Sequence, residues 1–75
     1  MTDYSFFLAS FVGARDGTAV ELHGSDDEVV AEVFEDAESG ACTFAMPDGV
    51  SVPVSLVWEL LRRAALEFPG AAGEL

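Results

Sequence analysis

The pattern of apolar and polar residues divides the chain into four short alternating segments and one longer segment with helical spacing. Side chains alternate with the period of two that β-strands require in residues 4–12, 18–23, 28–36 and 41–46. Each segment is separated from the next by a short group of turn-forming residues, including Asp16-Gly17 after the first segment. Short connections favour neighbouring strands, so we expect an antiparallel β-meander of three or four strands.

The third alternating segment, residues 28–36, allows two interpretations. Its sequence EVVAEVFED contains glutamate and alanine, which favour a helix. Valine and phenylalanine dominate it, and turn-forming residues flank it closely, which favours a strand. We favour the strand.

A single amphipathic helix is expected over residues 53–68. Proline at position 53 suits a first helical turn, and Pro69-Gly70 suits the end of the helix. At 100° per residue, one broad apolar face contains Val54, Val57, Trp58, Leu60, Leu61, Ala64, Ala65 and Phe68. The predicted fold is therefore α+β, a meander of three to four strands followed by one C-terminal helix packed on one sheet face. We expect a single domain in residues 1–69 and a flexible tail in residues 70–75.

The first strand, YSFFLASFV, is apolar on both of its faces. The sheet face under the helix should collect Phe6, Leu8, Val20, Leu22, Val29, Val33, Phe44 and Met46, with Trp58 from the helix. The opposite face should hold Phe7, Phe11, Glu21, His23, Val30, Glu32, Phe34 and Thr43. We name this opposite face the far face; a β-bulge would exchange part of its membership. One helix of this length can cover only one face of the sheet, so the far face is expected to expose phenylalanines among carboxylates.

An exposed apolar patch with a polar rim is typical of an interface. Three explanations remain open for the far face. It could pair with itself in a homodimer, it could bind a different and basic protein, or loops and the tail could fold over it.

The net charge of the chain limits the classes of partner that it is expected to bind. Fourteen acids and three arginines give a formal net charge of −11. This field repels nucleic acid and anionic membranes and attracts basic surfaces. The N-terminus has no positively charged leader, and no apolar run approaches the ~18 residues of a membrane span. We expect neither direct nucleic-acid binding nor membrane binding, and we predict a basic protein partner or a homodimer.

No residue pattern predicts catalysis, a metal or a cofactor. His23 and Cys42 are the single histidine and the single cysteine, too few for a usual zinc site. A calcium loop beginning at Asp36 would need glycine and glutamate where Ala41 and Pro47 stand. We expect His23 to be solvated and Cys42 to be a buried structural thiol. A single cysteine permits no internal disulfide, which favours the cytoplasm.

Small size, strong acidity and the lack of catalytic motifs give the chain a general character that resembles small acidic bacterial immunity proteins, antitoxins and phage-encoded inhibitors. This resemblance implies a non-enzymatic protein that blocks a basic, nucleic-acid-handling partner. The homodimeric assembly module, paired through the aromatic sheet face, is the alternative. The residues expected to contact the partner are three apolar anchors, Phe7, Phe11 and Phe34, and five charge complements, Glu21, Glu32, Asp26, Asp27 and Glu28.

Overall fold

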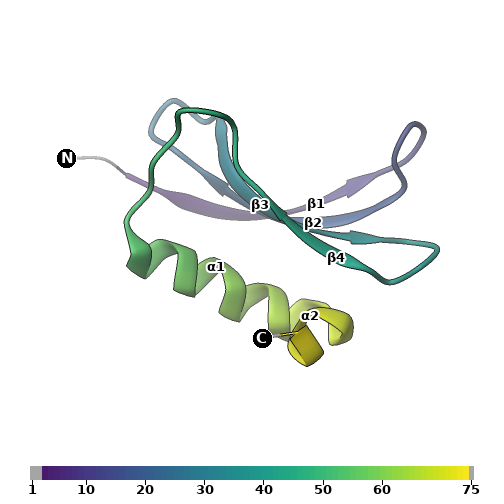
Figure 1. Cartoon of the computed structure of the whole chain (residues 1–75). Coiled ribbons are helices and arrows are strands. Elements are labelled where there is room, and N and C mark those ends of the chain that lie inside the picture. The colour runs from purple at the N-terminus through teal and green to yellow at the C-terminus, as the bar shows by residue number, and fades with distance from the viewer. Residues whose placement is uncertain (1–2, 75) are drawn as a thin grey trace.

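A computed structural model describes residues 3–74 and contains one four-stranded antiparallel sheet with two helices on one face (Figure 1). The strands are β1 (Ser5–Phe11), β2 (Gly17–His23), β3 (Val29–Asp36) and β4 (Cys42–Ala45), and the helices are α1 (Val54–Glu67) and α2 (Pro69–Glu74). The spatial order β1-β2-β3-β4 follows the chain order. The predicted α+β meander is therefore confirmed, and residues 28–36 form a strand.

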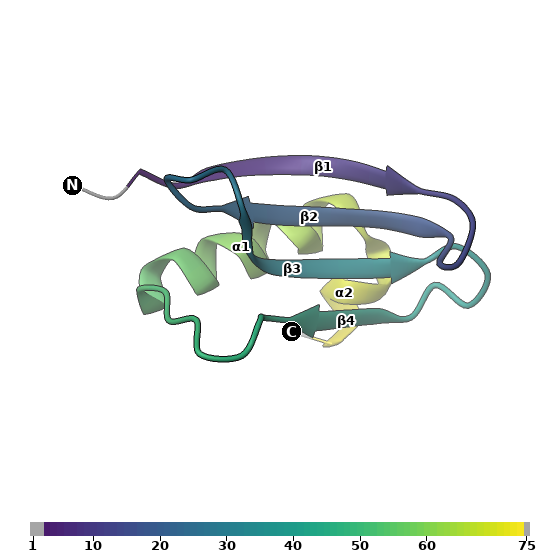
Figure 2. The ribbon, with the colours of Figure 1, turned by 90° about the horizontal axis from the view of Figure 1, so that it is seen from above.

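The core lies between the two central strands and the helices. Both views place α1 across one face of the sheet, and its contacts with the sheet are mainly with β2 and β3 (Figures 1 and 2). The buried core residues are Val20, Leu22, Ala31 and Val33 from the sheet and Leu60, Ala64, Phe68 and Ala71 from the helical segment. The inner faces of the two edge strands are only partly covered as a result.

A β-bulge exchanges two valines between the faces of the sheet. Leu22 pairs with Ala31 and His23 pairs with Val29, which leaves Val30 as an extra residue on β3. Val30 packs against the core under the helix. Paired residues on antiparallel strands share a face, so Val29 follows His23 to the far face. The sequence predicts the reverse for both valines, because strict alternation does not reveal a bulge.

The sheet-facing side of α1 is narrower than its apolar pattern suggests. Leu60 and Ala64 are fully buried, and they lie one turn apart on the same side of the helix. Trp58, expected in the core, is 69% exposed on another side. The prediction for Trp58 was wrong because a helix lying over only two strands presents a narrow stripe to the sheet.

The chain continues beyond α1 as a second short helix. Phe68 leaves the helical conformation with an extended backbone, and Pro69 then begins α2. Ala71 of α2 is buried in the core. Residues 69–74 are therefore helical where the sequence predicts a tail from residue 70, because a helix-ending Pro-Gly pair does not reveal that a new helix begins there; residue 75 lies outside the described residues.

Candidate protein-binding surface

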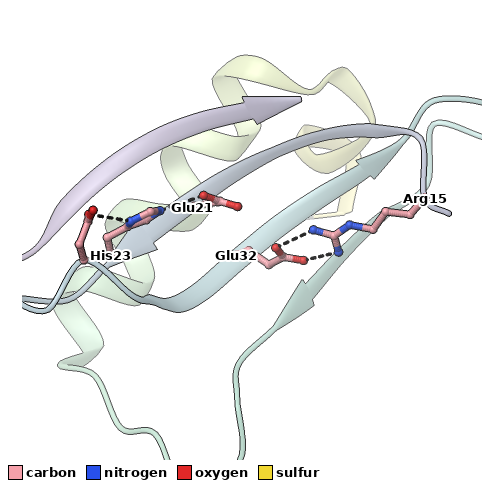
Figure 3. Close-up of polar contacts among 5 residues, drawn as sticks. Arg15, Glu21, His23 and Glu32 are labelled. Carbon is pink, nitrogen blue, oxygen red and sulfur yellow. Dashed lines mark hydrogen bonds and ion pairs between the residues drawn. The ribbon is translucent and has the colours of Figure 1, made fainter. Parts of the chain in front are cut away.

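The far face of the sheet carries a row of residues that the strand register aligns. Phe7 of β1 pairs with Glu21 of β2, and Glu21 pairs with Glu32 of β3. Two glutamates directly opposite each other on one face repel. Glu32 binds the guanidinium of Arg15, and Glu21 binds the imidazole of His23 (Figure 3).

Arg15 covers one end of the far face. It extends from the β1–β2 loop, and its guanidinium binds both carboxylate oxygens of Glu32, with Nη1–Oε2 and Nη2–Oε1 distances of 2.8 and 3.0 Å (Figure 3). The same guanidinium lies 4.3 Å from the ring centroid of Phe11 and 4.3 Å from that of Phe34. Arg15 thus joins a bidentate ion pair to two cation–π contacts. The two rings also contact each other edge to face, with their centroids 6.1 Å apart.

Gly17 makes room for this aromatic cluster. A Cβ atom at position 17 would lie 2.6 Å from the ring of Phe34 and 2.1 Å from the backbone oxygen of Glu35. Both distances are far below van der Waals contact. Glycine at this position therefore leaves the space that the ring of Phe34 occupies.

His23 closes the other end of the face between two carboxylates. Its Nε2 lies 2.8 Å from Oε1 of Glu21, and its Nδ1 lies 3.2 Å from Oδ1 of Asp27. A neutral imidazole has only one N–H to donate, so both bonds together require the imidazolium. The hydrogen bond with Glu21, reinforced by that with Asp27, raises the pKa of His23 despite its partial burial. The expectation that His23 is solvated was wrong.

Phe7 is the aromatic side chain of the far face that stays most accessible. Its ring packs on the His23 ring at a centroid distance of 4.4 Å and is 47% exposed. The β2–β3 turn follows His23 directly and exposes Asp26, Asp27 and Glu28. His23 touches both Phe7 and Asp27, so the ring and the acidic turn form one continuous surface. We call Phe7, His23, Asp26, Asp27 and Glu28 the Phe7 patch.

The other expected contact residues are less accessible. Phe34 and Glu21 are each 9% exposed, and the side chain of Glu32 is 14% exposed in its pair with Arg15. Phe11 is half-buried beside Phe34. Four of the eight expected contact residues thus lie together in the Phe7 patch. The other four contact neighbouring side chains of the far face; they are Phe11, Phe34, Glu21 and Glu32.

Sequence reasoning missed the roles of Arg15 and His23. The alternation pattern places two glutamates and three phenylalanines on one face. A nearby cation would stabilise both the carboxylates and the aromatic rings of this face. Arg15 is the nearest cation in the sequence, but it lies in a loop, where alternation assigns no face. Its reach back over β3 becomes visible only in three dimensions.

Comparison of the chain with protein-family models, curated proteins and solved structures finds no match.

Within residues 3–74, no group of three or more His, Cys, Asp and Glu side chains is placed to hold a metal ion. Neither described helix has the length and apolar character needed to cross a membrane. Cys42, expected to be a buried structural thiol, is half-buried and packs against the core.

Replacing Gly17 by alanine should destabilise the protein by about 1–3 kcal/mol, the usual effect of forcing extra volume into a packed site. The added methyl group meets a backbone oxygen, which cannot rotate away. Chemical denaturation measures the change. Gly73→Ala is the matched control, because a Cβ atom there meets nothing within 4 Å. Equal stability of both variants would contradict the close packing at Gly17.

The imidazolium of His23 should make stability fall as the pH rises. The folded-state pKa of His23 is raised, so its stabilising contribution is complete below the ordinary histidine pKa and is lost as the pH passes the folded value. Denaturation midpoints should therefore decrease as the pH rises above the ordinary histidine pKa of about 6.5. The His23→Gln variant should show a flatter profile there. An unchanged profile in the variant would mean that His23 does not carry this effect.

Proposed function

We propose that this protein is a non-enzymatic, cytoplasmic binding protein that blocks a basic protein partner through the Phe7 patch. The partner's basic surface would be one that normally handles nucleic acid, with carboxylates taking the place of phosphates. The observation that carries the proposal is an exposed aromatic ring continuous with an exposed acidic turn on a strongly acidic chain.

The distribution of ion pairs leaves the surface acidic. Arg15 binds Glu32, while Arg62 and Arg63 both bind Glu59. Among the residues that the structure describes, the three arginines thus pair with two glutamates, Glu32 and Glu59, of a chain that has fourteen acids. The remaining carboxylates create a negative field that would steer a basic partner and raise its association rate.

The Phe7 patch combines this field with an apolar anchor. Interfaces usually draw most of their binding energy from a few aromatic or arginine side chains surrounded by polar residues. Phe7 supplies the aromatic group, and Asp26, Asp27 and Glu28 supply the polar surroundings. The ring sits on a strand of the sheet and rests on His23, so little conformational freedom remains for it to lose on binding.

The proposal is tested by comparing three immobilised baits in the same cell extract. These are the natural chain, a Phe7→Ser variant, and a variant with Asp26→Asn, Asp27→Asn and Glu28→Gln. We expect the natural chain to retain a basic protein that both variants lose. The purified pair should then bind more weakly as ionic strength rises, because salt screens the charges.

The matched control is Phe44→Ser, which removes a comparably exposed ring from the opposite side of the sheet. This variant should retain the partner. The proposal is wrong if retained proteins are acidic or neutral, if salt leaves the affinity unchanged, or if Phe44→Ser loses the partner while Phe7→Ser keeps it.

A further inference from the structure

β1 forms an open edge of the sheet. Figure 2 shows β1 at one side with β2 as its sole neighbour, and β4 at the opposite side. Every second residue of an edge strand directs its backbone N–H and C=O groups outward, where another strand can bind them. The seven residues of β1 therefore offer a ready template for strand addition.

The two edges of this sheet differ in their protection. β4 has only four residues, and Pro47 follows soon after it, both of which limit pairing. β1 is longer, contains no proline and carries no charged side chain in SFFLASF. Lysine, glutamate or proline normally protect such an edge in a monomer. The absence of these residues from β1 leaves its edge unprotected.

The distribution of charge along the chain favours a second copy of this chain as the partner that pairs with the edge of β1. Residues 4–14 contain no charged residue, although the chain as a whole carries −11. Two copies that met along β1 would therefore pair two strands that carry no charged side chain. A basic partner would gain nothing from charge on β1 itself, since this strand carries no acid.

Symmetry defines the arrangement of two paired copies. A two-fold axis perpendicular to the sheet joins two β1 strands antiparallel and keeps both helices on the same side. Residues that lie opposite each other on the two β1 strands must then point to the same face of the joined sheet. This condition allows registers such as Leu8 opposite Leu8 of the second copy. The product is one continuous eight-stranded sheet.

An apolar groove beside β1 supports this arrangement. It has a volume of about 230 Å³ and lies between β1 and α1, with Leu8 and Leu66 in its lining. Leu8 is 59% exposed and Leu66 is 83% exposed, although both are large apolar side chains. The charged residues of the groove, Arg63 and Glu67, have opposite signs. Two such grooves would face each other across the shared seam.

We infer that the protein forms a two-fold symmetric homodimer through β1, with Leu8 and Leu66 of both copies closing the seam on the helix side. The acidic turn of the Phe7 patch remains at the end of each sheet in this dimer, while Phe7 itself, on β1, borders the seam on the far face. The dimer would therefore present two copies of that turn to partners.

The test is the solution mass of the full chain by sedimentation equilibrium at low and high salt. We expect twice the chain mass of 7.9 kDa, with association unchanged or stronger at high salt as repulsion between acidic chains is screened. Leu8→Glu should give a monomer, because it places like charges at the seam. Phe44→Glu, with the same charge change at the β4 edge, should stay dimeric.

Hydrogen exchange supplies a second measurement. The outward amides of β1 should be protected in the natural chain and should exchange rapidly in Leu8→Glu. If Leu8→Glu does not fold, Ser10→Glu, at an exposed position of the same strand, replaces it. A natural chain that is monomeric at all concentrations overturns the inference. So does a dimer that Phe44→Glu dissociates and the folded β1 variants do not.

Discussion

Two cationic side chains cover much of the sheet face that the helix leaves open, and the rest of the surface depends on them. A single helix over β2 and β3 cannot shield both sides of a four-stranded sheet. Arg15 lies over Phe11 and Phe34, while His23 lies against Phe7 and bridges two carboxylates. The strongly acidic chain thus uses two of its few cationic groups where glutamates and aromatic rings meet.

This use of cations has a direct consequence for binding. Arg15 shields Phe34 and Glu32 from solvent, and His23 shields Glu21. The charged and aromatic groups of the far face are therefore largely paired within one chain, and Phe7 is the aromatic side chain that stays most accessible there. A face-to-face homodimer through the aromatic cluster becomes less attractive, since little apolar area remains there. The uncharged edge of β1 offers a better route to self-association.

The sequence was sufficient for most of the fold. Alternation located all four strands to within two residues at each end, and the 3.6-residue pattern located α1 to within one. It failed at Val30, because a bulge adds a residue that period-two reasoning does not count. It failed at Trp58, because helical periodicity indicates an apolar face but not how wide a stripe the sheet covers. For the candidate site, alternation correctly placed Phe7, Phe34, Glu21 and Glu32 on one face. Their exposure depended on Arg15, whose loop position carries no periodic signal.

The most direct test of this account is a nuclear magnetic resonance measurement of the Arg15 side chain. Stacking between Phe11 and Phe34 should shift its δ-proton resonances strongly upfield through ring currents. Nuclear Overhauser contacts from these protons to both rings should accompany the shift. Random-coil shifts without such contacts would mean that Arg15 does not cover the sheet. Phe34 and Glu32 would then be open to solvent, and the far face would again need a foreign cover.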